Sequence, residues 1–118
     1  MEIIKSSKIK WIEGKGELNY KKRILTDKIP KAVNLIQEAI MPPNGKIPQH
    51  SHTKTDEIFY LVEGKIQLNS KDKKTEIKKG DIIIINKNEP HGFENKTNKN
   101  AKLLVLKINF EKDDAILY

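Results

Sequence analysis

The sequence predicts an all-β domain, built as a sandwich or barrel of about nine short strands. Segments rich in β-branched and aromatic residues, with apolar positions two apart, recur along the whole chain. Clusters of Gly, Pro and Asn separate these segments, and helical periodicity is almost absent. No internal repeat or linker divides the 118 residues, so we expect a single domain over residues 1–118.

Three strands are expected in the first third of the chain. Residues 1–13 and 17–26 each alternate between apolar and polar side chains, and two glycines between them mark a turn. The segment 31–41 contains good helix formers, so a helix is the alternative there. We favour a strand, because Pro30 and Pro42 bracket the segment and its apolar positions share one parity with a single polar exception, Gln37.

The middle of the chain begins with a turn at residues 42–45 and contains a strand with two apolar faces. Residues 56–63 are apolar on both faces apart from Glu57, so both faces should be covered. One cover would be the barrel interior and the other a partner sheet from a second subunit, which predicts a homodimer. Residues 65–70 and 75–79 then form a hairpin around a polar tip.

The last third should contribute three more strands. Ile82–Ile85 is a continuous β-branched run, as expected of a buried strand, and a turn at residues 86–90 leads into the strand that begins at His91. Residues 101–110 form another strongly β segment. The tail, residues 111–118, is expected to fray or to form one helical turn.

Composition excludes several classes of function. Without cysteine, a disulfide framework and a thiolate metal site are impossible. The N-terminus resembles neither a secretory signal nor a membrane span, so we expect a cytoplasmic protein that does not bind membranes. The net charge of +7 comes from lysines scattered over the whole length, with Arg23 as the one arginine. This distribution indicates a solvated surface and not a nucleic-acid interface.

Most of the candidate metal-ligating residues lie in one stretch, residues 45–64. His50, His52 and Glu57 lie within eight residues, and residues two apart in a strand point to the same side. A buried carboxylate beside apolar residues is costly unless a cation pairs with it. His91, the third histidine of the chain, lies in a second glycine-bounded block, residues 80–95. Imidazole and carboxylate groups converging from neighbouring strands are suited to a first-row transition metal.

These two blocks resemble the two conserved motifs of the cupins, small β-barrels of the jelly-roll type, also called double-stranded β-helices. The first motif is matched by His50, His52, Glu57 and Gly64, and the second by Gly80, His91 and Asn95. Asn88 stands where the family usually has glycine, but asparagine tolerates a left-handed backbone better than most residues. The blocks cover about a third of the chain, and the expected strands extend the likeness over nearly all of it.

The resemblance implies that His50, His52, Glu57 and His91 hold one divalent transition metal, namely Mn, Fe, Ni, Co, Cu or Zn. An octahedral ion with four protein ligands keeps two open positions, where a small-molecule substrate binds. The leading functional hypothesis is therefore a small metal-dependent enzyme, of dioxygenase, isomerase or decarboxylase type, acting on a compact oxygen-bearing metabolite. The alternative is a non-catalytic sensor or binding protein, which the lack of an obvious second base favours. Asn95 is expected to orient the His91 turn or the pocket rim and not to bind the metal.

Overall fold

The computed structural model describes residues 6–27 and 32–118. A short 3₁₀ turn, η1 (Ser6–Lys8), precedes the strands of this part of the chain. The strands are β1 (Ile12–Glu13), β2 (Lys21–Thr26), β3 (Val33–Met41), β4 (Lys46–His52), β5 (Asp56–Glu63), β6 (Lys65–Ser70), β7 (Lys73–Lys78), β8 (Ile82–Ile85), β9 (His91–Glu94), β10 (Ala101–Ile108) and β11 (Ala115–Leu117). The all-β prediction is confirmed, and the segment that could have been a helix is strand β3.

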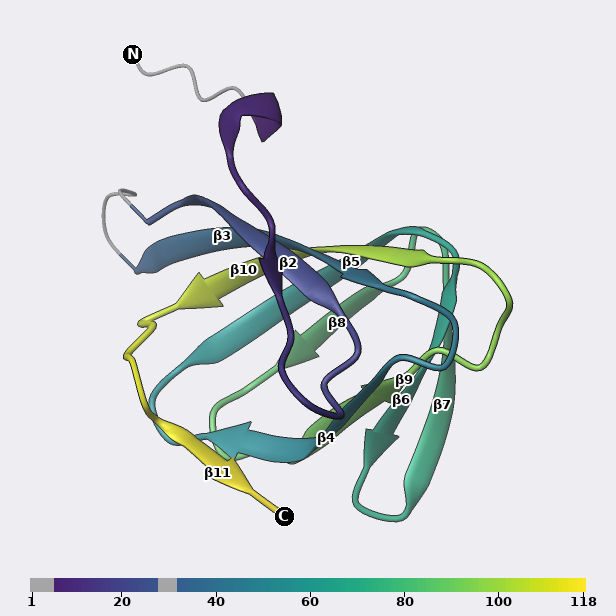
Figure 1. Cartoon of the computed structure of the whole chain (residues 1–118). Coiled ribbons are helices and arrows are strands. Elements are labelled where there is room, and N and C mark those ends of the chain that lie inside the picture. Colours follow the sequence, from purple (N-terminus) through teal and green to yellow (C-terminus); the bar gives the residue numbers. More distant parts are fainter. Residues whose placement is uncertain (1–5, 28–31) are drawn as a thin grey trace.

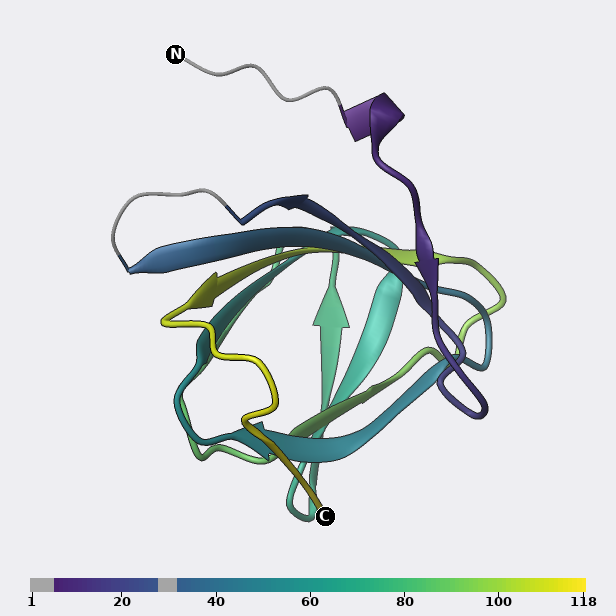
Figure 2. The same ribbon diagram turned by 60° about the vertical axis from the view of Figure 1, so that its left-hand side comes forward.

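The strands form two antiparallel sheets that face each other across a common interior (Figures 1 and 2). One sheet has the order β1-β2-β3-β10-β5-β8, and the other has the order β11-β4-β9-β6-β7. Many neighbours in space are distant in sequence; β10, for example, pairs with β3 on one side and β5 on the other. This is the two-sheet barrel that the sequence resemblance implies.

The inward row of each strand builds an apolar core. On β10, alternate residues are buried, beginning with Ala101, which is completely inaccessible to solvent. The core contains Met41, Phe59, Leu61, Ile66, Ile77, Ile83, Ile85, Phe93, Ala101, Leu103 and Val105. Met41, Ala101 and Leu103 lie at the end of the barrel where β3 ends and β10 begins, whereas Ile85 extends the core to the strand position next to Glu57. The polar inward residues Gln37, Glu57 and Lys107 lie towards the other end.

The backbone conformation at two turns accounts for the motif residues Gly64 and Asn88. Gly64, between β5 and β6, has φ 85°. A Cβ added to it would lie 2.6 Å from the backbone oxygen of Asn100, so both conformation and space require glycine. Asn88 has φ 69°, which is the left-handed conformation that allows asparagine to replace the usual glycine.

Three predictions about the strands are wrong. Residues 1–5 of the predicted strand 1–13 lie outside the described residues, and within 6–13 only Ile12–Glu13 is a strand, because η1 occupies the start. Ile82–Ile85 is a strand but is not buried throughout: Ile82 is 63% exposed and Ile84 is 67% exposed. β8 is an edge strand whose outer face is left uncovered by the described residues. The tail is not a frayed end or a helical turn, since β11 pairs with β4.

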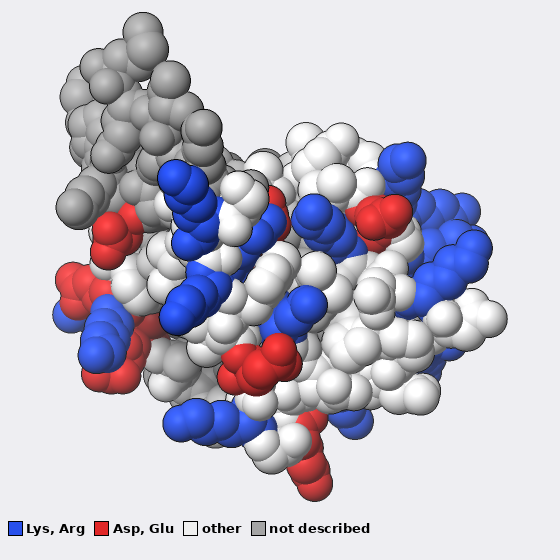
Figure 3. Space-filling model, turned by 45° about the horizontal axis from the view of Figure 1, so that its top comes forward, with Lys and Arg blue, Asp and Glu red and all other residues white. Residues whose placement is uncertain are grey.

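The charged surface agrees with the scattered lysines of the sequence. On the face shown in Figure 3, basic side chains are interspersed with acidic ones and with uncharged surface. In residues 6–27 and 32–118, no helix has the length and apolar character needed to span a membrane.

Candidate metal centre

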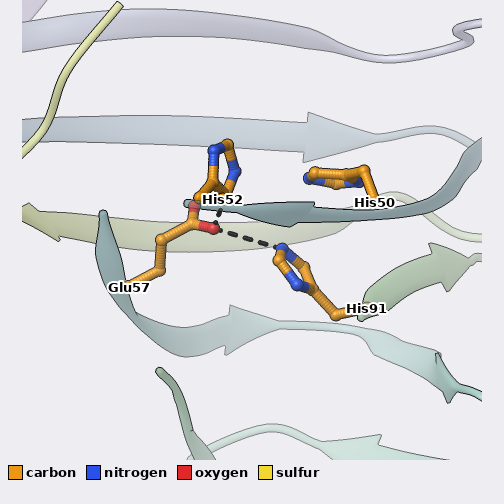
Figure 4. A group of neighbouring side chains, drawn as sticks. All are labelled: His50, His52, Glu57 and His91. Carbon is orange, nitrogen blue, oxygen red and sulfur yellow. Dashed lines mark ion pairs between the residues drawn. The ribbon is translucent and has the colours of Figure 1, made fainter. Parts of the chain in front are cut away.

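The fold brings the four predicted ligands together from three strands. His50 and His52 lie on β4, Glu57 on β5 and His91 on β9. His50 and His91 are direct partners in the β4–β9 pairing, and the period of two places His52 on the same face as His50. Glu57 reaches them from the facing sheet. Each of the four residues has one potential ligand atom in this cluster, and these four atoms lie within 4.8 Å of one another. The four side chains point to a shared space (Figure 4).

The atoms at the centre of this cluster lie close together, but two of them make no hydrogen bond. Oε1 of Glu57 lies 3.1 Å from Nε2 of His52 and 3.1 Å from Nε2 of His91. Nevertheless, Oε1 of Glu57 and Nε2 of His91 are buried and have no hydrogen-bond partner among the described residues. Buried polar atoms without partners are rare and costly. A bound cation would satisfy both, so the donor set fits a divalent transition metal.

The other ring nitrogen of each histidine is already engaged. Nδ1 of His50 lies 2.9 Å from the Pro48 carbonyl oxygen, and Nδ1 of His91 lies 2.9 Å from that of Glu89. Nδ1 of His52 lies 2.7 Å from Oδ1 of Asp114. These oxygens are acceptors, so each Nδ1 carries the proton and donates it. In its neutral form, which is the form that binds a metal, each ring therefore directs the lone pair of Nε2 to the centre, and the Nδ1 acceptors act as second-sphere partners do in metal sites.

The electrostatics keep the carboxylate ionised. Burial alone would raise the pKa of Glu57, but the neighbouring His52 and His91 outweigh it and hold that pKa far below its usual range. Glu57, with Asp114, raises the pKa of His52 against the effect of burial. Burial lowers the pKa of His50 and thus favours its neutral form, which is the form that binds metals.

Sequence reasoning missed Asp114. Its Oδ1 accepts from His52, while its Oδ2 accepts from the backbone N–H groups of Lys54 and Thr55 and from the Thr55 hydroxyl. This network fixes the turn after β4 and the orientation of the His52 ring together. The apolar run Ala115–Leu117, which follows an acidic pair, was the available signal of a strand that docks here.

A cavity of about 320 Å³ opens beside the cluster. His50, His52 and Glu57 line it, and most of the remaining wall is apolar, including Phe59 and Phe93. The polar side chains of Tyr20, Lys22, Gln37 and Lys107 also reach it. β11 closes one side with Ala115 and Leu117, the direct partners of His52 and His50.

Other polar residues near the inner surface of the barrel differ in position. Gln37 and Lys107 line the cavity, whereas the turn residue Asn109 is not part of its lining. Asn95 is buried and lies outside the metal cluster. Its amide donates to the carbonyl groups of Met41 and Lys99, and its carbonyl accepts from Thr97, so it organises the loop that follows β9.

Comparison with known proteins agrees with this geometry. An uncharacterised protein of Methanocaldococcus jannaschii is 39% identical over 69 residues, which cover 58% of this chain and 55% of that protein. The oxalate-binding protein of Thermotoga maritima is 26% identical over 93 residues, or 79% of this chain and 77% of that protein. The solved structure of the polyketide cyclase RemF from Streptomyces resistomycificus has a TM-score of 0.78 at 26% identity, covering 97% of this chain and 89% of that chain.

The family model of the cupin domain matches residues 37–107, which is more than half of the chain and includes all four residues of the cluster. The two facing antiparallel sheets are the double-stranded β-helix of that family. The chain therefore belongs to the cupin family.

Proposed function

We propose that this protein holds one divalent transition metal through Nε2 of His50, His52 and His91 and one carboxylate oxygen of Glu57, and that it acts on a compact oxygen-bearing metabolite in the adjacent cavity. The observation that supports the metal is the convergence of these atoms, two of which are buried without a partner among the described residues. When bound, such an ion supplies Lewis-acid or redox chemistry at the positions that the protein leaves open.

The cavity limits the size of the metabolite. At about 320 Å³ it is at the lower end of small-molecule sites, which span roughly 300–1,000 Å³. Phe59 and Phe93 contribute apolar wall, which excludes water and strengthens polar interactions inside the cavity. The Thermotoga maritima relative is named for binding oxalate, a compact molecule with four oxygens, and this supports a small oxygen-rich ligand.

The reaction classes that we propose are oxygenation, isomerisation and decarboxylation. Each needs a substrate oriented by its oxygens, and the polar groups beside the ligands are available for this task. Besides the ligands, Tyr20, Lys22 and Lys107 are the titratable residues among the described residues that line the cavity. Burial raises the pKa of Tyr20, so its hydroxyl stays protonated at neutral pH and can donate a hydrogen bond to the substrate.

The second candidate function is non-catalytic binding of the same kind of molecule. Glu57 is the one carboxylate lining the described part of the cavity, and as a metal ligand it would not be free to act as a base. A cavity without a second base favours a sensor or binding protein.

Elemental analysis of the purified protein, followed by a screen of small hydroxy acids, oxo acids and sugars for binding and turnover, distinguishes the enzyme from the non-catalytic binding protein. One metal per chain with turnover supports the enzyme, binding without turnover supports the sensor, and absence of metal contradicts both.

We also propose a homodimer formed through the outer face of β5 and β8. This face exposes Tyr60, Val62, Ile82 and Ile84, of which Ile82 is 63% exposed and Ile84 is 67% exposed. β8 is also an edge strand, with backbone groups available to a second copy. Light scattering should give the mass of a dimer for the wild type and of a monomer for Ile84→Lys. Ile12→Lys, at the opposite edge of the same sheet, should remain dimeric; a monomeric wild type contradicts the proposal.

A further inference from the structure

Lys107 is a buried cation without an ion-pair partner among the described residues. It occupies the inward row of β10, where the preceding inward residues are Ala101, Leu103 and Val105, and it is 9% exposed. Within the described chain its ammonium group donates no hydrogen bond and forms no ion pair; it lies over the Phe110 ring, 5.1 Å from the ring centroid. Burying a charge in this way is costly, and such exceptions to the rules of folding concentrate at functional sites.

Gln37 is a second polar side chain that is buried in an inward row. It is 8% exposed, it occupies the inward row of β3, and its amide has no hydrogen-bond partner among the described residues. Gln37 pairs with Val105, and Lys107 pairs with Leu35, so the two polar side chains are diagonal neighbours on one face of the sheet. Both line the cavity.

The same face carries the carboxylate of the metal cluster. Lys107 is the direct partner of Glu57 in the β10–β5 pairing, so their side chains project to the same side. Lys107 and Gln37 therefore border the same cavity as His50, His52 and Glu57. A divalent ion held by three neutral imidazoles and one carboxylate keeps a net positive charge, and Lys107 adds a second positive charge to the wall.

We infer that Lys107 and Gln37 recognise the anionic group of the ligand, and that this ligand is a compact carboxylate that also contacts the metal through oxygen. The inference rests on the proposed function, because it concerns the same cavity. The Lys107 ammonium pairs with the carboxylate charge, and the Gln37 amide donates to one of its oxygens. A phosphate fits less well, since sites for phosphate usually combine several backbone N–H groups or arginines. The polar side chains that line this cavity, apart from the candidate ligands, are Tyr20, Lys22, Gln37 and Lys107, and no arginine of the described residues is among them.

Isothermal titration of metal-loaded protein with oxalate, malonate and succinate tests the inference. These dianions differ in the spacing between their carboxylates, and inorganic phosphate serves as the comparison anion. Elemental analysis precedes each titration, and circular dichroism checks the fold. Lys107→Met should weaken the best-bound dicarboxylate about 10- to 100-fold and Gln37→Leu about three- to tenfold, with metal content unchanged. Lys102→Met is the matched control, because Lys102 lies on the same strand but on its outer face, near Glu38.

The outcomes separate this inference from the proposed function. Wild-type protein that takes up no metal overturns both. If the loaded wild type binds none of the dicarboxylates, or if the Lys107→Met variant binds them equally well, the inference is overturned and the metal site stands. Phosphate binding as tight as that of the best dicarboxylate, with the same loss in Lys107→Met, overturns the assignment to a carboxylate. Lys107→Arg, which keeps the charge, should retain more affinity than Lys107→Met if the lysine acts through its charge.

Discussion

The two motif blocks, residues 45–64 and 80–95, and the tail, residues 111–118, contribute to the metal centre in different ways. The blocks contain all four candidate ligands, and His50 and His91 are oriented by backbone carbonyls two residues earlier in the same block. The tail contains no ligand, but its Asp114 orients His52 from a position 62 residues away. The candidate ligands are thus encoded within two short blocks, whereas part of their orientation depends on a distant segment.

The largest effect should follow from removing a ligand of the motif blocks. Glu57→Ala or His91→Ala should lower metal affinity by more than about 100-fold, beyond the 10- to 100-fold typical of a supporting residue. The barrel should stay folded, because neither residue is part of the apolar core. Elemental analysis after dialysis measures the metal content, and circular dichroism shows whether the protein is folded. Glu94→Ala on β9 is the control, and equal metal in wild type and both ligand variants would refute the assignment.

Asp114→Asn tests the tail alone. The carboxylate accepts from His52 through one oxygen and from three donors through the other, and an amide cannot accept on both sides. We expect metal affinity to fall about tenfold or more while all four ligands remain. Competition with a chromophoric chelator measures it. Asp113→Asn removes the same charge from the neighbouring exposed residue and should have no effect; equal losses in both variants would assign the effect to net charge.

Acid should release the metal from all three histidines, because protons compete with the ion for Nε2. Metal affinity should fall by about tenfold per pH unit for each competing proton, with release below roughly pH 6. His52, whose pKa Glu57 and Asp114 raise, should be protonated at higher pH than His50, whose pKa burial lowers. Glu57, with its lowered pKa, stays ionised over this range. Metal retained at pH 4 by folded protein would contradict histidine ligation.

The smallest effect should come from a contact that docks the tail without touching His52. The hydroxyl of Tyr118 lies 2.9 Å from that of Ser51, whereas the backbone N–H of Tyr118 donates separately to Gln49. Tyr118→Phe should therefore cost about 1 kcal/mol of unfolding free energy. Urea unfolding measures this, and metal affinity should change less than in Asp114→Asn. A larger loss of metal affinity in Tyr118→Phe would show that docking, and not Asp114, is the main support of His52.

The strands and part of the candidate ligand cluster were predictable from the sequence for the same physical reason. Strand alternation has a period of two, so the spacing of His50 and His52 places them on one face, and the position of Glu57 among apolar residues indicates a buried carboxylate. His91 lies far along the chain, and its place in the cluster came from the motif resemblance. Geometry then added the unpaired atoms and the three engaged Nδ1 atoms.

The errors in the prediction arise where local pattern and tertiary context differ. A run of isoleucines has no polar residue to mark which face meets solvent, so the exposed outer face of β8 could not be recognised. The tail has a short β11, and its pairing with β4 depends on contacts with residues more than 60 positions earlier. Propensity within the segment therefore carries little information about its final state.

The position of β11 links opening of the cavity to release of the His52 ring. Its residues Ala115 and Leu117 are part of the cavity wall, and Asp114 just before it holds the His52 ring. Local unfolding of this one strand would open the cavity and release the His52 ring in the same step, so we expect a bound metal and the docked tail to stabilise each other by thermodynamic linkage. Hydrogen exchange reports this coupling: metal should slow exchange of the Thr53 and Tyr118 amides, which bond the tail to β4 and the turn after it.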